Sequence, residues 1–250
     1  MRLAVKKLKK IFVISIIFFI VIVIVVFAFV CRFSAHKPQI ISENLEQATT
    51  TPYEIAHGDR TKKQVIFTFD GGAGVQSGNQ ILKVLAKHHV KGTFFLTGKM
   101  VETDPDLVKR IVASGSETFN HTFDHPDLTT VSDAKIGNEL AQMEKVLQTV
   151  AGVSSKPYFR PPFGAYDARV LKVAAGQGYQ LVFWTIDAFD WKESKGETAG
   201  QVRKRILSTL APGNIYLMHV GDDITGVILD DVFTAIESRG YKIVSLTQGL

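Results

Sequence analysis

The hydrophobic pattern of this 250-residue chain changes character along its length. Residues 11–30 form an unbroken apolar run without a charge, and residues 31–60 show little periodicity. From residue 64 onward, short β-rich runs alternate with segments whose apolar residues recur at helical spacing. The pattern predicts four parts: a basic tail at 1–10, a transmembrane helix at 11–30, a stalk at 31–60 and a folded domain at 61–250.

Strands and helices alternate without a break in the predicted domain. Asp104 with Pro105, Ser132 and Asp167 are suitable residues for helix N-termini. Such alternation predicts an α/β fold with a parallel sheet, either open and doubly wound or closed as a barrel, which spacing alone does not distinguish. Seven strands are expected, at residues 65–69, 93–97, 116–119, 158–160, 180–186, 215–218 and 241–245.

The apolar run at 11–30 is long enough to span a bilayer, which takes about 20 residues in a helix. A cleaved signal peptide is the alternative, but its apolar core is usually shorter, and Phe29 and Val30 are poor cleavage positions. We therefore predict an uncleaved single-pass anchor in the cell membrane. Basic residues flanking such a segment stay in the cytoplasm, which leaves the folded domain extracellular or in a lumen. Five precede it: Arg2, Lys6, Lys7, Lys9 and Lys10.

The net charge of +5 is explained entirely by these five residues. Without them the chain has 24 basic and 24 acidic residues, so the outer part is formally neutral. A neutral domain lacks the electrostatic footprint of a nucleic-acid-binding protein, and we exclude nucleic acid as a partner. The lone Cys31 also excludes an internal disulfide framework.

Two histidines four residues apart, His121 and His125, follow a predicted strand. Imidazoles at such spacing are candidate metal ligands, although two solvated loop histidines would look the same. In both candidate architectures ligand sites lie at the carboxyl ends of the strands. Further polar residues at predicted strand ends are therefore expected to converge there: Asp70, Arg160, Asp187, Asp190 and His219.

The types of these residues suggest chemistry. Asp70, followed by two glycines, suits a general base or a metal ligand, or else caps a turn. Arg160, in a proline-stiffened loop, could pair with a carboxylate such as Asp70 and keep it ionised. Asp187 and Asp190 lie beside Trp191, whose face could stack on a sugar ring or pack in the core. His219 ends an apolar strand, where a buried structural histidine is the alternative to a catalyst.

Together these residues resemble the polysaccharide deacetylase family, which is carbohydrate esterase family four with its NodB homology domain. The resemblance covers residues 65–246 through five motifs in order, at residues 68–70, 121–126, 160–164, 187–191 and 217–219. It implies a distorted (β/α) barrel of seven or eight strands and metal-dependent hydrolysis of N-acetyl groups on sugars. The implied substrate is an N-acetylated polysaccharide such as peptidoglycan or a chitin-like glycan.

The resemblance also implies a role for each site residue. His121 and His125 would bind a divalent metal, commonly zinc, with cobalt, nickel and manganese as alternatives. Asp70 would be the base, and His219 would protonate the leaving amine. The remaining residues would assist: Arg160 would orient Asp70, Asp190 would tune His219, the backbone N–H of Phe163 would stabilise the oxyanion, and Trp191, Leu217 and Pro161 would shape the substrate pocket.

One position departs from the family pattern. The second of two adjacent aspartates, a metal ligand in the family, is Gly71 here, which should weaken metal binding. Asp124, between the two histidines, is a candidate substitute. Three functions are weighed: a membrane-anchored deacetylase, a non-catalytic glycan-binding module that lost its chemistry with the carboxylate, and a glycosidase using Asp187 and Asp190 as its carboxylate pair.

Overall fold

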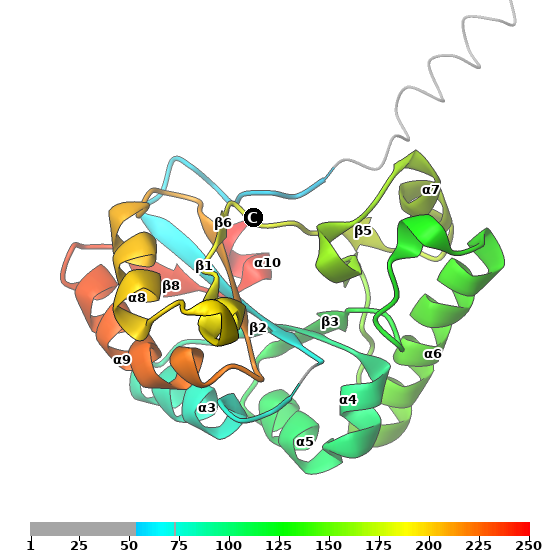
Figure 1. The fold of residues 1–250 in the computed structure, drawn as a ribbon, viewed down its shortest axis with the longest axis horizontal. Coiled ribbons are helices and arrows are strands. Elements are labelled where there is room, and N and C mark those ends of the chain that lie inside the picture. The colour runs from blue at the N-terminus through cyan, green and yellow to red at the C-terminus, as the bar shows by residue number, and fades with distance from the viewer. Residues whose placement is uncertain (1–53, 73) are drawn as a thin grey trace, which may run out of the picture. The chain divides into compact units, whose positions relative to one another are not determined.

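The computed structural model describes residues 54–72 and 74–250 (Figure 1). The predicted tail, the predicted transmembrane helix and most of the predicted stalk lie outside the described residues. In the part that is described, no helix has the length and apolarity needed to cross a membrane. The domain boundaries and the extracellular location therefore stay predictions.

All strand pairs of the main sheet are parallel, in the order β5-β4-β3-β2-β1-β7-β6, with β8 beside the start of β1. In Figure 1 the helices α3 to α9 form an arc around these strands, so the sheet is a curled half-barrel. The predicted parallel α/β fold is confirmed in this form. The strands are β1 Gln64–Gly71, β2 Thr93–Leu96, β3 Glu117–Asn120, β4 Tyr158–Phe159, β5 Gln180–Leu181, β6 Ile186–Asp187, β7 Ile215–His219 and β8 Lys242–Val244.

The strand predicted at 180–186 is instead two short strands at opposite edges of the sheet, β5 and β6. The reason is an upstream residue that competes for the backbone between them. The N–H of Ile55 donates to the carbonyl of Leu181, and the N–H of Phe183 donates to the carbonyl of Ile55. Ile55 is also buried in the core. Ile55, which lies in the stretch predicted as stalk, therefore packs and hydrogen-bonds with the folded domain.

The helices begin largely where the sequence predicted. The hydroxyl of Ser132 accepts from the N–H of Lys135, and the carboxylate of Asp167 accepts from the N–H of Val170. Pro105 opens its helix, as expected of proline in a first turn. The helices are α3 Gly78–Lys87, α4 Gly98–Thr103, α5 Pro105–Ala113, α6 Asp133–Ala151, α7 Ala168–Gly176, α8 Ala199–Ser208, α9 Asp223–Glu237 and α10 Leu246–Gly249, with 3-10 turns η1 Leu128–Thr130, η2 Pro162–Gly164 and η3 Asp190–Lys195.

Strand β1 explains how the fold places its functional residues. Successive side chains of a strand point to opposite faces, and β1 is buried on both. Val65, Phe67 and Phe69 pack in the core beneath the helices, whereas Ile66 packs in the interior of the curled sheet. By alternation Asp70 shares the interior face with Ile66. Its place at the carboxyl end of β1 sets a carboxylate at the open end of that interior.

Candidate active site

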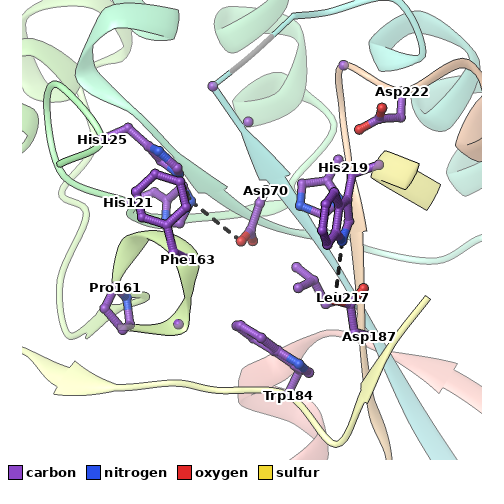
Figure 2. Close-up of a pocket in the computed structure, with 15 residues that line it drawn as sticks. Asp70, His121, His125, Pro161, Phe163, Trp184, Asp187, Leu217, His219 and Asp222 are labelled. Atoms are coloured by element: carbon purple, nitrogen blue, oxygen red, sulfur yellow. Dashed lines mark hydrogen bonds and ion pairs between the residues drawn. The ribbon is translucent and has the colours of Figure 1, made fainter. Parts of the chain in front are cut away.

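A pocket opens at the carboxyl ends of the strands and brings together most of the predicted site residues (Figure 2). Arg160 and Asp190 lie behind its wall, fully buried. Residues more than 140 positions apart become neighbours because Asp70 on β1 is paired in register with His219 on β7. Of the ten residues to which the family resemblance assigns a role, eight line the pocket: Asp70, His121, His125, Pro161, Phe163, Trp191, Leu217 and His219.

The two histidines are held in the form that binds metals. Nδ1 of His121 lies 2.9 Å from the carbonyl oxygen of Arg160, which can only accept, so Nδ1 carries the proton and Nε2 has a free lone pair. Nε2 of His121 is 3.1 Å from Nε2 of His125. Burial lowers the pKa of both imidazoles, that of His125 to about 4, so both are neutral at pH 7. Their geometry and protonation fit a divalent cation.

Glu139 on α6 fixes the loop between these histidines, and the sequence analysis did not identify it. One oxygen of its fully buried carboxylate accepts from the backbone N–H of Phe123 at 2.8 Å and of Asp124 at 2.7 Å. Lys135 pairs with the other oxygen at 2.6 Å. The available signal was a charged residue on the apolar face of a helix, between Ile136 and Leu140.

Replacing Glu139 by glutamine is expected to weaken metal binding without removing a ligand. The amide is neutral and presents an NH2 group to Lys135, so the turn that aims His125 loses its anionic anchor. Groups that orient metal ligands typically contribute 10- to 100-fold to affinity, and we expect a loss of about 10-fold. Zinc titration would measure it. Glu102→Gln on the exposed surface is the control, and equal affinities for the two variants would contradict the positioning role.

Asp70 and Arg160 form a buried ion pair. Nη1 of Arg160 lies 2.6 Å from Oδ1 of Asp70 and 2.9 Å from the hydroxyl of Thr68. Nε and Nη2 donate to the backbone carbonyls of Val182 and Phe183. Burial alone would raise the pKa of Asp70, but the charge of Arg160, together with the charges of His121 and His219 and the hydrogen bond from Arg160, outweighs burial and holds that pKa below its usual value. Asp70 is therefore a carboxylate at neutral pH.

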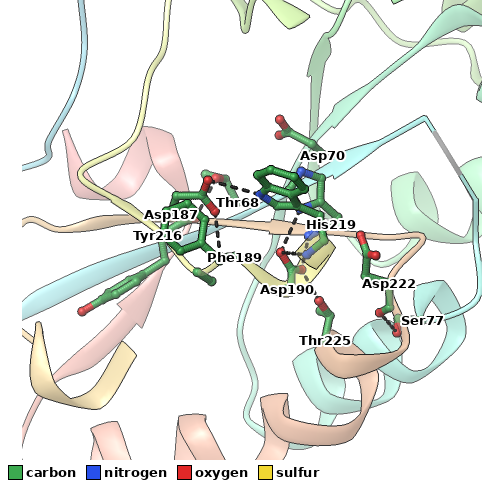
Figure 3. A network of polar contacts seen from close by, with 12 residues as sticks. Thr68, Asp70, Ser77, Asp187, Phe189, Asp190, Tyr216, His219, Asp222 and Thr225 are labelled. Carbon is green, nitrogen blue, oxygen red and sulfur yellow. Dashed lines mark hydrogen bonds and ion pairs between the residues drawn. The ribbon is translucent and has the colours of Figure 1, made fainter. Parts of the chain in front are cut away.

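His219 and Asp190 form a second couple (Figure 3). His219 lies on the opposite side of Asp70 from the two histidines (Figure 2). Nδ1 of His219 is 2.8 Å from Oδ1 of Asp190, whose Oδ2 accepts from the backbone N–H of His219 at 2.7 Å and from the hydroxyl of Thr225. Burial lowers the pKa of His219, but the hydrogen bond and charge of Asp190 outweigh it and raise the pKa to about 9. His219 is therefore an imidazolium at neutral pH.

Asp222 joins this couple to make a group of three possible metal ligands. Ligand atoms of Asp190, His219 and Asp222 lie within 4.8 Å of one another, so a cation could be held there. The oxygens of Asp190 already accept several hydrogen bonds, and His219 favours its protonated form. A protonated imidazole carries a proton on both ring nitrogens and so has no lone pair to offer a metal. This group is better suited to holding a proton, and the pair of His121 and His125 to holding a metal.

Aromatic side chains form one wall of the pocket. Trp191 is 38% exposed, and its Nε1 donates to Oδ2 of Asp187 at 3.2 Å. Oδ1 of the same carboxylate accepts from the backbone N–H of Phe189 at 2.7 Å. Trp184, which the sequence analysis did not single out, lines the pocket too and stacks on Phe183. Asp190 is fully buried behind His219. It is thus not accessible to a sugar, and the glycosidase interpretation of Asp187 and Asp190 loses its carboxylate pair.

Neither Gly71 nor Asp124 supplies a further ligand. Asp124 pairs with Lys99 at 3.0 Å and Lys135 at 3.3 Å and does not line the pocket. The suggestion that Asp124 substitutes for the family's second aspartate is therefore wrong. At Gly71 a Cβ atom would lie 2.4 Å from Sδ of Met100 and 2.9 Å from Cδ2 of Leu96. A side chain at this position would therefore require Met100 and Leu96 to move.

Gly71→Asp is therefore expected to destabilise the protein. Added atoms in a packed interior typically cost about 1–3 kcal/mol of unfolding free energy. The cost should shrink in a Met100→Ala background, because the clashing thioether is gone, and chemical denaturation of the four variants measures this coupling. Gly200→Asp is the control, since nothing lies within 4 Å of a Cβ there. An equal cost of Gly71→Asp in both backgrounds would contradict the steric explanation.

The curled parallel sheet and its convergent pocket define an α/β protein in which a carboxylate, a protonated imidazole and a neutral imidazole pair face one cavity. The sequence comparisons identify the family. Residues 57–182 match the model of the polysaccharide deacetylase family. The chain therefore belongs to this family, as predicted, and several of its relatives are named as deacetylases, hydrolases of N-acetyl amide bonds.

Three relatives illustrate the range of the family. The chain is 35% identical to the peptidoglycan-N-acetylmuramic acid deacetylase PdaA of Bacillus subtilis, over 84% of this chain and 80% of PdaA. The solved structure of PdaA superposes with a TM-score of 0.76, covering 82% of this chain and 88% of the PdaA chain. A peptidoglycan-N-acetylglucosamine deacetylase of Bacillus cereus is 34% identical, over 76% of this chain and 69% of that relative. The solved structure of a family pseudoenzyme from Bacillus anthracis is 31% identical, over 79% of this chain and 69% of that chain, with a TM-score of 0.74.

Proposed function

We propose that the chain is a metal-dependent deacetylase that removes N-acetyl groups from peptidoglycan amino sugars, anchored in a cell membrane by residues 11–30 with its domain outside. One observation carries the catalytic part: a carboxylate, Asp70, lies between a neutral imidazole pair and a protonated imidazole, His219, in one pocket. Relatives named for two different peptidoglycan sugars support the substrate class.

His121 and His125 would hold a divalent cation through their Nε2 atoms. When bound, that cation supplies Lewis acidity toward the acetamide carbonyl and acidifies a water molecule. Asp70 accepts the proton of the attacking water, and Arg160 keeps Asp70 ionised and oriented. The water oxygen bonds to the carbonyl carbon, and the C–N bond of the resulting tetrahedral intermediate breaks as His219 donates its proton to the amine nitrogen. The products are acetate and a free amino sugar.

The backbone N–H of Phe163 would stabilise the oxyanion. Phe163 adopts a positive φ of 59°, an unusual conformation for a residue with a side chain, in the 3-10 turn between Pro162 and Gly164. Its ring packs edge-on against His125, with centroids 4.7 Å apart, and is 71% exposed. The turn and this ring contact bring Phe163 next to His125, which supports this role. Pro161, Trp191 and Leu217 line the same pocket and would enclose the acetyl group and sugar.

Acetate release tests the proposal. The full-length chain in detergent is incubated with N-acetylated peptidoglycan and with chitin oligomers, with added zinc or with a chelator. Release that the chelator abolishes and that His125→Ala removes is the expected result. His57→Ala, at an exposed histidine away from the pocket, is the control and should keep full activity. Release that is unaffected by chelation would overturn metal dependence.

A glycan-binding module without chemistry is the second candidate. Gly71 favours it, because a ligand position of the family is empty of side chain and closed by Met100. The similarity to a solved pseudoenzyme also favours it. This function predicts saturable binding of the glycan by folded protein and no acetate from either substrate. The acetate experiment therefore separates the two candidates.

A further inference from the structure

Catalytic zinc sites have three protein ligands, of which the imidazole pair of the candidate metal centre supplies two. Two histidines alone leave two positions of a tetrahedral cation to water or substrate. Gly71 offers no donor, and its side-chain direction is occupied by Met100. Asp124 is engaged by Lys99 and Lys135 outside the pocket. Any carboxylate ligand must therefore come from elsewhere in the pocket.

Asp70 is placed to supply it. Oδ2 of Asp70 lies 3.6 Å from Nε2 of His121, which in turn lies 3.1 Å from Nε2 of His125. With metal–ligand bonds of about 2.0–2.1 Å in a tetrahedral zinc site, two ligand atoms lie about 3.4 Å apart. The two observed separations fall on either side of this value. Figure 2 shows the carboxylate of Asp70 pointing toward the two imidazoles.

The hydrogen bonds around these atoms leave the correct lone pairs free. The proton of His121 is on Nδ1, directed at the carbonyl of Arg160, so Nε2 faces Oδ2 of Asp70 without a proton of its own. Arg160 occupies Oδ1 of Asp70 and leaves Oδ2 turned to the imidazole. Two electron-rich atoms facing each other across 3.6 Å repel unless a cation lies between them. Both have the supporting partners that orient metal ligands in proteins.

We propose that Asp70 is the third protein ligand of the divalent cation in this chain, binding through Oδ2 and replacing the carboxylate that Gly71 lacks. The inference rests on the metal-binding part of the proposed function and is independent of the glycan. Each carboxylate oxygen has a second lone pair, so Asp70 can still accept a proton from water. The residue would then serve both as ligand and as base.

Zinc affinity distinguishes a ligand from a base, because loss of a base alone leaves affinity intact. The full-length chain in detergent is titrated with zinc in competition with a chelating dye, without glycan. Asp70→Asn is expected to bind at least about 100-fold more weakly than the wild type, more than the loss of a supporting group would cause. Asp187→Asn, a carboxylate of the same pocket, is the control and should bind as the wild type does. Wild-type affinity in folded Asp70→Asn would overturn the inference.

Asp70→Asn also removes the buried partner of Arg160, so a second measurement uses the wild type alone. In a crystal structure grown with zinc, Oδ2 of Asp70 is expected about 2.0–2.2 Å from the ion. An ion held by both histidines with Oδ2 beyond bonding distance, or no ion at all, would overturn the inference. If zinc is bound through Asp70 but no acetate is released, the inference stands and the proposed catalytic function fails.

Discussion

Replacing Arg160 by methionine is expected to lower the free energy of unfolding by about 3–5 kcal/mol, the usual cost of breaking a buried ion pair. The guanidinium is fully buried and donates to Asp70, Thr68 and two backbone carbonyls. Methionine roughly fills the volume but leaves the carboxylate of Asp70 without its counter-charge and the carbonyls without donors. The pKa of Asp70 should then rise, because the largest of the charges that offset its burial is gone.

Arg203→Met is the matched control for this experiment. Arg203 makes an ion pair with Asp231, but the two side chains are 44% and 59% exposed. Exposed pairs typically contribute no more than about 1 kcal/mol, so the same chemical change should have little effect there. Chemical denaturation of both variants measures the difference. Equal losses would show that burial does not set the energy of the Arg160 pair.

The convergence of the site was predictable because it follows from rules that act locally. Parallel strands bring their carboxyl ends to one edge, so residues after strands could be placed together from spacing alone. The sequence pattern indicated that edge correctly for Asp70, His121 and His219, which all line the pocket. The pairing of Arg160 with Asp70 could be anticipated only in part. Both lie at the carboxyl ends of strands of one sheet, β4 and β1, but β3 and β2 lie between these strands, and only the curl of the sheet brings the two residues together.

The features that were missed depend on contacts between distant segments. Glu139 belongs to a helix, and only the structure shows that its carboxylate reaches the N–H groups of the histidine loop. The segment at 180–186 reads as one strand, but Ile55 takes the hydrogen bonds that would have continued it. Gly71 read as a simple loss of a ligand, whereas Met100 fills the space that a side chain would need. Tertiary competition of this kind leaves no periodic signal in a sequence.

Replacing His219 by glutamine is expected to lower kcat by about 10²–10⁴-fold, the usual contribution of a positioned general acid. Glutamine keeps a hydrogen-bond donor near Asp190 but has no proton to transfer to a leaving amine. Stopped acetate-release assays on the wild type and the variant measure this loss. His57→Gln, an exposed histidine outside the pocket, is the control and should leave kcat unchanged. A variant with wild-type kcat would exclude His219 as the acid.

The dependence on pH tests the same residue through a property unrelated to turnover. The pKa of His219 is raised from 6.5 to about 9 in the folded protein, so the folded state binds the proton more tightly than the unfolded state. This contribution to stability, at most about 3 kcal/mol, is fully present below pH 6.5 and is lost as pH rises to about 9. The unfolding free energy of His219→Gln should therefore fall less steeply than that of the wild type across this range. Because the same proton is the one donated to the amine, the wild-type kcat should decline over the upper part of that interval. Parallel stability curves for the two proteins would mean that Asp190 does not hold this proton, and the acid would have to be sought elsewhere in the pocket.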